Sequence, residues 1–390
     1  MDLAERGDVS AGLTVHEPLY IDTTSAADRF LSSVERSATV AVDTEGASFH
    51  RFVDRIYLLQ MSTRDLTAVL DPLAIGAPAP LGRILESDKI EKVFHDADYD
   101  LRLLHQDYGW NTRRLFDTRV AAQLLGIRAF GLAALLERSF GLRLDKKHQR
   151  ADWSMRPLPR DMLDYASQDT MYLLELRDRL ASELESAGRW SWAEEEFERL
   201  EGTRWEQAEG EDTGYMRIKG ARDLDRRELA IFRELVRFRD GIARELDRAT
   251  FRVAGNEALF AVAKERPQTL EALAAIKGVP RGIAERRGAE MLAAVRRGME
   301  VPEDQLPKFP RAPRWDRDAD FDNRVNALRV AREEAAQRLG LDPGFLCARE
   351  KLETIARKKP KTLEELAEVP DLRQWQVEVL GPAFLRALEK

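Results

Sequence analysis

The chain has 390 residues, of which 44% are hydrophobic and 34% are charged, and its formal net charge is -7 at pH 7. This length predicts two or three domains with cores of their own, and the glycine and proline contents do not fit a fibrous or disordered chain. The start of the chain shows no secretory signal, and no run of about 18 apolar residues could span a membrane, so a cytoplasmic protein is expected.

Strand patterns come first along the chain. Residues 39–45, Thr-Val-Ala-Val-Asp-Thr-Glu, have the β-branched and apolar composition of a buried strand. Further strands are predicted at residues 56–63, 67–71 and 92–94, and helices at 98–107, 117–125, 131–140 and 159–187. Asp117 precedes one of these helices and is interpreted as its N-cap rather than as a metal ligand. This order of elements predicts a mixed sheet flanked by helices.

The second half of the chain contains two helical segments that repeat each other. The pattern of residues 259–276 recurs at residues 352–369 with a constant offset of 93, which indicates a duplicated small helical domain. Residues 202–214, which are acidic and bounded by glycine, and residues 301–316, which are rich in proline, are predicted to be linkers. The expected domains are therefore residues 1–201, 215–300 and 317–390.

Charge is distributed unevenly over these segments. Residues 1–214 carry a net charge of -13, residues 215–300 carry +6 and residues 301–390 are neutral. This distribution fits metal-binding carboxylates in residues 1–214 and phosphate-binding side chains in residues 215–300. Ordinary surface charge would also produce it. Cys347 is the only cysteine, which rules out an intrachain disulfide and a cysteine zinc site. Its apolar neighbours predict a buried thiol, which suits a reducing cytoplasm.

Several acidic residues stand where an apolar environment makes their charge costly. Asp43 and Glu45 are two apart on the first predicted strand, so both side chains point to one face, about 6–7 Å apart along the strand. Tyr165 and Asp169 are four apart on a predicted helix and share one face of it, and Asp100 lies near the start of another helix. Two adjacent acids in an apolar strand require a neutralising partner, and a divalent cation is one.

The residue types in this set indicate the kind of metal that it would bind. Carboxylates from separate elements, with no histidine or cysteine cluster nearby, suit the hard ions Mg²⁺ and Mn²⁺ rather than zinc. Two such ions about 3.5–4 Å apart can hold the attacking and the leaving oxygen of a phosphodiester hydrolysis. A tyrosine stays protonated at neutral pH and can hold the attacking water. Each motif alone is weak, because Asp-x-Glu pairs usually belong to solvated surface.

In combination, the motifs resemble a known superfamily. The order Val42-Asp43-Thr44-Glu45, His95-x4-Asp100-Leu101 and Tyr165-x3-Asp169 resembles the DEDD exonucleases, in their tyrosine-bearing branch. The stretch from Leu144 to Leu158 looks like the signature that precedes the last motif in the ribonuclease D family, and the duplicated helical segments resemble HRDC domains. The resemblance covers residues 30–388. It implies an α/β ribonuclease-H-like exonuclease domain, with a mixed sheet flanked by helices, followed by two small all-α HRDC-like domains.

The resemblance also implies a role for each residue of the set. Asp43, Glu45 and Asp169 would hold the ion that activates water, Asp43 and Asp100 the ion that stabilises the leaving 3′ oxygen, and Tyr165 would orient the water. All five are expected to converge at one end of the sheet. The implied reaction is metal-dependent 3′→5′ hydrolysis of RNA to nucleoside 5′-monophosphates. Transfer RNA precursors are the expected substrates, and the enzyme is expected to be a monomer with no evident protein partner.

Other residues are candidates for contact with RNA, each with an ordinary structural alternative. Gln60 could touch the terminal nucleotide or face a neighbouring strand, and His95 could contact the RNA end or be a satisfied core histidine. Trp153 and Arg156 could meet RNA, but we favour a role in pinning their loop. Cationic candidates for phosphate contact, with surface solvation as the rival interpretation, are Lys146, Lys147, Arg217, Lys219, Arg222, Arg226 and Arg227.

Two rival functions stay open from the residues. The acids do not separate RNA from DNA, because discrimination depends on contacts with the 2′-hydroxyl. A DNA 3′→5′ exonuclease is therefore the first rival, although the HRDC pair and the signature before the last motif favour RNA. The second rival is a non-catalytic RNA-binding scaffold, against which the presence of all four acids and the tyrosine argues.

Overall fold

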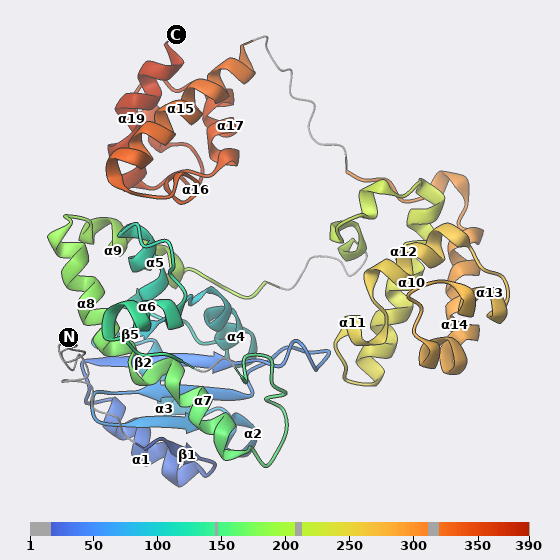
Figure 1. Cartoon of the computed structure of the whole chain (residues 1–390), viewed down its shortest axis with the longest axis horizontal. Helices are drawn as coiled ribbons and strands as arrows, with labels where there is room; N and C mark the ends of the chain where they lie inside the picture. Colours follow the sequence, from blue (N-terminus) through green and yellow to red (C-terminus); the bar gives the residue numbers. More distant parts are fainter. Residues whose placement is uncertain (1–16, 145–146, 207–212, 311–319, 390) are drawn as a thin grey trace, which may run out of the picture. The chain divides into compact units, whose positions relative to one another are not determined.

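A computed structural model describes residues 17–144, 147–206, 213–310 and 320–389 (Figure 1). The chain forms two compact units. The first unit contains the sheet and the second of the helical repeats, and the second unit contains the first repeat together with residues 46–55. Lys146 and parts of both expected linkers lie outside the described residues. No helix in the described ranges is long and apolar enough to cross a membrane.

The first unit is built on a six-stranded sheet in the order β1-β4-β3-β2-β5-β6. The strands are β1 (Leu19–Ile21), β2 (Thr39–Glu45), β3 (Leu58–Ser62), β4 (Thr67–Leu70), β5 (Glu91–Phe94) and β6 (Leu115–Asp117). β3 runs antiparallel to both β2 and β4, and the other pairs are parallel, so the predicted mixed sheet is confirmed. The three-residue strands β1 and β6 were not predicted, because so short a strand shows no alternation of its own.

Nine helices are interspersed with or follow these strands in the described residues before the first linker. They are α1 (Thr24–Val34), α2 (Pro72–Ile75), α3 (Ala79–Leu85), α4 (Asp98–Tyr108), α5 (Thr118–Leu124), α6 (Leu132–Phe140), α7 (Arg160–Met171), α8 (Leu173–Ser186) and α9 (Trp190–Glu201). The single helix predicted at 159–187 is wrong, because α7 and α8 meet at Tyr172, which has φ -111° and ψ 5°. The break lets α7 cover β2, β3 and β4 while α8 packs against α5.

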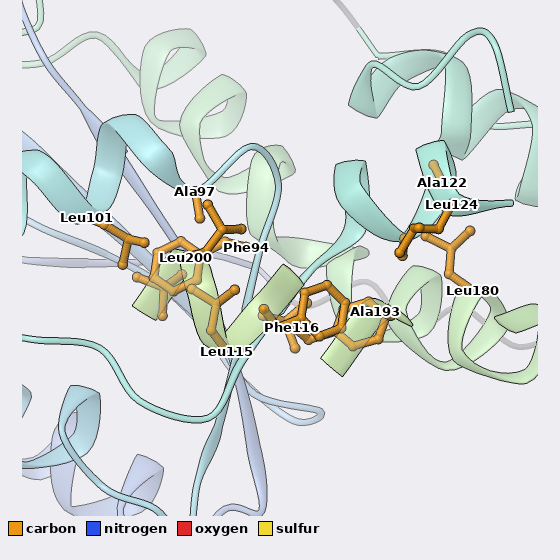
Figure 2. Close-up of a cluster of buried hydrophobic side chains, with 14 of the residues drawn as sticks. Phe94, Ala97, Leu101, Leu115, Phe116, Ala122, Leu124, Leu180, Ala193 and Leu200 are labelled. Carbon is orange, nitrogen blue, oxygen red and sulfur yellow. The ribbon is translucent and has the colours of Figure 1, made fainter. Parts of the chain in front are cut away.

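Figure 2 shows part of the core, where buried side chains from strands and helices meet. Phe94 of β5 and Phe116 of β6 lie among side chains of α4, α5, α8 and α9, and the Phe116 ring is 4.8 Å from that of Phe197. Asp117 ends β6 and accepts hydrogen bonds from the backbone N–H groups of Arg119 and Val120, which confirms it as the N-cap of α5. This packing fixes the edge of the sheet from which α4 and α5 begin.

The two helical repeats have the same fold, and their helices correspond at the offset of 93 residues found in the sequence. The first repeat consists of α10 (Arg226–Glu245), α11 (Thr250–Val253), α12 (Asn256–Glu265), α13 (Leu270–Ala275) and α14 (Arg281–Glu300), and it is flanked by the short 3-10 helices η1 (Gly214–Arg217), η2 (Ala221–Asp223) and η3 (Glu303–Gln305). The second consists of α15 (Phe321–Leu339), α16 (Pro343–Leu346), α17 (Arg349–Lys358), α18 (Leu363–Ala367) and α19 (Gln374–Leu388).

Equivalent residues of the two repeats adopt equivalent conformations. Thr269 and Thr362 both N-cap the fourth helix of their repeat, as predicted. Arg266 and Lys359, also 93 apart, end the preceding helix with φ of 51° and 52°. Cys347 is buried in the second repeat, as expected. The duplication therefore extends from sequence to backbone detail.

The second repeat is packed against α9 within the first unit. The Arg373 guanidinium pairs with the Glu196 carboxylate at 3.0 Å, and the same carboxylate accepts the indole N–H of Trp375 at 3.0 Å. The indoles of Trp192 and Trp375 stack with centroids 5.0 Å apart. A Cβ at Gly126, where φ is +76°, would lie 2.1 Å from the carbonyl oxygen of Gly340. The second repeat is therefore held to α9 by stacked indoles and by a buried ion pair.

Residues 46–55, here called the β2–β3 connection, belong to the second unit. Their backbone is held by the first repeat, because Ala249 donates to the carbonyl of His50 at 3.1 Å and Asp247 accepts the N–H of Phe52 at 3.2 Å. The Phe52 ring packs on the core of the repeat under the Arg244 guanidinium, 5.2 Å away. The connection thus behaves as a sixth element of the first repeat.

Candidate active site

Three carboxylates meet where β2 and α7 face each other. Asp43 and Glu45 alternate with Thr44 on β2, so both project from the face of the sheet that α7 covers. Asp169 projects from α7, and one oxygen of each of the three carboxylates lies within 4.8 Å of the others. Residues 124 positions apart in the chain are brought together here by the packing of one helix on the sheet.

Asp100 lies beside this cluster, in the first turn of α4, with 5% of its surface exposed. One of its oxygens accepts hydrogen bonds from the backbone N–H and the hydroxyl of Thr44, at 3.0 and 2.5 Å. Thr44 points to the opposite face from its two neighbours and so links β2 to α4. The sequence reasoning missed Thr44, although its place between Asp43 and Glu45 was a signal for a supporting role.

The four acids strongly perturb each other electrostatically. Burial raises the pKa of Asp43 well above its ordinary value, and the charge of Asp169 raises it further. Burial, with the charges of the other three acids, likewise raises the pKa of Glu45. Burial and then the charge of Asp100 raise the pKa of Asp169 to about 7. Four acids in one place resist ionisation unless a cation joins them.

The donor set at this site fits a divalent metal ion. Every ligand atom offered by Asp43, Glu45 and Asp169 is a carboxylate oxygen, and the three lie close enough to share one ion. A bound cation would offset the repulsion that raises their pKa values. The predicted metal ligands on β2 and α7 are therefore placed together, with Asp100 held next to them.

Tyr165 lies one helical turn before Asp169 on α7. Its ring stacks on that of Trp153 with centroids 6.1 Å apart and an interplanar angle of 28°, and the His148 ring meets its edge at 5.8 Å. Trp153 itself is 1% exposed. The loop before α7 therefore fixes the tyrosine ring from two sides.

Arg156 anchors the same loop to the sheet. Its guanidinium forms two bonds with the Asp71 carboxylate, at 2.5 and 2.7 Å, and donates to the backbone carbonyls of Tyr57 and Trp153, at 2.9 and 2.8 Å. These contacts support the interpretation that Trp153 and Arg156 pin the loop. Asp71, which ends β4, was not among the residues singled out.

Gln60 and His95 are both placed inside the fold. Gln60 is fully buried on β3 directly opposite Asp43, and neither atom of its amide has a partner among the described residues. Its side chain therefore projects from the same face of the sheet as the Asp43 carboxylate. His95 shares a hydrogen bond of 2.9 Å with the Thr118 hydroxyl, and burial lowers its pKa to about 4. It is consequently neutral at physiological pH.

The basic candidates in the first repeat divide into two groups. Arg217 and Lys219 are exposed, and the structure shows no role for them within the fold. Arg226 donates to the carbonyls of Glu303 and Leu306, and Arg227 donates to those of Gly298, Met299 and Val301. Arg222 lies over the Phe309 ring at 5.0 Å. The second group therefore ties the end of the repeat to its beginning.

Comparison with known proteins agrees with this geometry. Residues 18–185 match a family model described as 3′-5′ exonuclease, and residues 228–295 and 321–388 both match the HRDC domain. The chain is 30% identical to a ribonuclease D of Nitrobacter hamburgensis, over 94% of each chain.

Two solved structures extend the likeness to the whole fold. A protein from Bifidobacterium adolescentis is similar with a TM-score of 0.82 and 28% identity, over 96% of this chain and 97% of that one. The crystal structure of Escherichia coli RNase D, described as an exoribonuclease involved in structured RNA processing, is similar with a TM-score of 0.72 and 26% identity, over 96% and 99%.

Proposed function

This chain belongs to the ribonuclease D family of exoribonucleases, and from that premise we propose that it hydrolyses RNA from the 3′ end to nucleoside 5′-monophosphates with two divalent ions, Mg²⁺ or Mn²⁺. The observation that carries the proposal is the convergence of Asp43, Glu45 and Asp169 within 4.8 Å, next to Asp100. A purely carboxylate site of this kind suits phosphodiester hydrolysis, because metal-bound water needs no strong protein base.

Each side chain has a defined task in this proposal. Asp43, Glu45 and Asp169 would hold one ion, and Asp43 and Asp100 would hold the other. When bound, the ions stabilise the charge that develops on the attacking and leaving oxygens. Tyr165 keeps its phenolic proton at neutral pH and holds the attacking water by a hydrogen bond. Thr44 fixes the Asp100 carboxylate through its two hydrogen bonds.

The substrate is proposed to be structured RNA with a free 3′ end, such as a transfer RNA precursor. The family membership and the two HRDC domains support RNA over DNA. The buried Cys347, for which burial raises the pKa to about 11, suits work in a reducing cytoplasm. A DNA 3′→5′ exonuclease is the alternative, since the carboxylates bind the scissile phosphate in either polymer.

The test is a degradation assay on RNA and DNA oligonucleotides of one sequence, labelled at the 5′ end. We expect a descending ladder on RNA with magnesium or manganese, and no ladder with chelator. Asp100→Asn should lose activity on the order of 10³-fold, because several kcal/mol of charge stabilisation depend on its ion. Asp98→Asn is the matched control, since Asp98 is an exposed acid of the same helix that pairs with Arg102.

The other outcomes separate the alternatives. A ladder of equal strength on DNA would favour the DNA exonuclease. RNA binding without any ladder would leave only a scaffold function. Equal loss in Asp98→Asn and Asp100→Asn would show that the charge of α4, rather than a metal ligand, is responsible.

A further inference from the structure

The first repeat contains a groove of about 340 Å³ with an apolar floor and a basic rim. The floor is formed by Ile242, Leu246, Val253 and Ile283, and the rim by Arg248, Arg252, Arg286 and Arg287. These residues come from α10, the turn after it, α11 and α14. The arginines could bind the phosphate of a nucleotide, and the apolar residues could contact its base.

Three of the four arginines keep their charge available. Arg287 is neutralised by Glu245 at 2.5 Å and Glu290 at 3.1 Å. Arg248, Arg252 and Arg286 pair with no carboxylate in the part of the chain that the structure describes. The groove therefore has a net positive charge, which attracts a phosphate backbone.

Aromatic rings lie beside this rim. Phe251 of α11 and Phe49 of the β2–β3 connection are 54% and 46% exposed, and their rings meet edge to face with centroids 6.2 Å apart. Arg252 contacts both residues, because its guanidinium donates to the backbone carbonyl of Phe49 and is 5.9 Å from the Phe251 ring. Exposed rings next to guanidinium groups are a stacking platform for unpaired bases.

The second repeat shows that the fold does not require these residues. At the offset of 93, Arg248, Arg252, Arg286 and Arg287 correspond to Leu341, Phe345, Val379 and Leu380. Leu341 and Leu380 are buried, and Phe345 and Val379 pack against the core of the first unit. The same face is therefore apolar and covered in one copy and basic and open in the other.

We propose that the groove and the Phe49–Phe251 pair bind single-stranded RNA on the 5′ side of the nucleotide that is removed. Phosphates would meet Arg248, Arg252 and Arg286, and bases would stack on the exposed rings. The proposal rests on the exoribonuclease function described above. It replaces Arg226 and Arg227 as the candidate phosphate contacts, because neither lines the groove and Arg227 pairs with the Glu303 carboxylate.

The test measures binding separately from hydrolysis. Fluorescence anisotropy of a 5′-labelled, unstructured RNA would be followed on the full chain carrying Asp43→Asn, so that the RNA is not degraded. Arg248→Leu/Arg286→Val introduces the residues of the second repeat. It should weaken binding on the order of 10-fold and lower the slope of log affinity against log salt by about 1.4, for two lost phosphate contacts. Phe251→Ala should weaken binding about 5-fold without changing that slope.

The matched control removes the same charge elsewhere in the repeat. Lys264→Ala/Lys277→Ala takes away two exposed cations of the same repeat that do not line the groove. It should change the affinity less than 2-fold, as expected for screened surface charge. If Arg248→Leu/Arg286→Val unfolds at a lower temperature, Arg248→Gln/Arg286→Gln tests the same charges with smaller change to the surface.

Hydrolysis supplies the second measurement. In the chain with an intact active site, the groove variant should lower the ratio of kcat/KM on a long RNA to kcat/KM on a dinucleotide about 10-fold. No loss of affinity in the groove variants, or an equal loss in the control, would overturn the proposal. A chain that binds RNA through the groove but produces no ladder would instead overturn the proposed reaction and leave the binding site standing.

Discussion

The two helical repeats share one backbone and differ in what their equivalent faces do. In the second repeat, Leu341 and Trp375 belong to a face that packs against the exonuclease fold, and the buried Glu196–Arg373 pair holds it there. In the first repeat the equivalent face carries Arg248 and Arg286, and it is open. A duplicated domain has therefore been used once as structural support and once, in our proposal, as a binding surface. The difference lies in side chains, since the helices of the two repeats correspond in order and position.

The largest expected effect tests whether catalysis and RNA binding are separate. Asp169→Asn should lower hydrolysis on the order of 10³-fold, because in our proposal it removes a metal ligand. RNA affinity should stay within about 2-fold, since the phosphate contacts that we propose lie in the first repeat. Single-turnover hydrolysis and anisotropy measure the two quantities. Asp164→Asn, which changes an acid of the same helix that pairs with Arg160, is the control. If Asp169→Asn lost RNA affinity as well as hydrolysis while the control did not, catalysis and binding would not be separate.

The next prediction concerns the stability that the second repeat gives to the first unit through its contact with α9. Glu196→Ala leaves the Arg373 guanidinium and the Trp375 indole N–H buried without their acceptor. Breaking such a buried pair should lower the free energy of unfolding by about 3–5 kcal/mol. Urea denaturation followed by tryptophan fluorescence would report it, because Trp192 and Trp375 stack at this contact. Glu198→Ala on the exposed side of α9 should cost less than about 0.5 kcal/mol, and similar values for both variants would show a weak contact.

A smaller effect should come from the closest backbone approach. Gly126→Ala adds a methyl group 2.1 Å from the Gly340 carbonyl oxygen, at φ +76°. Gly141→Ala has nearly the same strain, with φ +70°, but meets nothing within 4 Å. Both substitutions carry a left-handed penalty of about 1–2 kcal/mol, and Gly126→Ala should lose about 1–3 kcal/mol more from overpacking. Equal stability of the two variants in the same denaturation assay would show that the repeat shifts without penalty.

The last prediction compares how the stability of each unit depends on pH. In the metal-free protein, Asp43, Glu45, Asp100 and Asp169 have raised pKa values in the folded state. Between the ordinary pKa of 3.8 and about 7 for Asp169, the folded chain binds more protons than the unfolded chain. Stability must therefore fall as pH rises through this window, and Tm of the first unit should drop with it.

Magnesium should reverse this drop, because it neutralises the ionised acids. The second unit serves as an internal control, since the four acids all belong to the first unit. Hydrogen exchange resolved by peptide would compare the units in one sample. A pH effect of equal size in both units, or one that magnesium leaves unchanged, would contradict the assignment to the four acids.

The acidic cluster was predictable because most of its members stand in short, regular spacings along the sequence. The two-residue spacing of Asp43 and Glu45 on a strand and the four-residue spacing of Tyr165 and Asp169 on a helix are local patterns, and the repeat is visible as a fixed offset. The number of metal ions and the role of each acid in holding them stay predictions. Tyr172 shows the limit of such patterns, because no glycine or proline marks the break between α7 and α8, and only packing against different partners causes it.

Long-range contacts account for what the sequence did not predict. Glu196 stands in a run of three glutamates on α9 and looks like surface, and its partner Arg373 follows 177 positions later. The arginine groove is assembled from α10, α11 and α14, so no single stretch shows it. The position of Gln60 opposite Asp43 depends on the register of β2 and β3, which the sequence did not show, and its contact with RNA stays a prediction.

The contact between α9 and the second repeat determines where the chain can be cut. A shortened protein that ends before α15 would expose the Trp192 indole and the apolar surface around it to water, and would leave Glu196 without the arginine and indole that bind it. Such a fragment would carry all four acids and still be prone to aggregate. The smallest soluble enzyme derived from this chain should therefore retain its C-terminal helices, even if RNA never touches them.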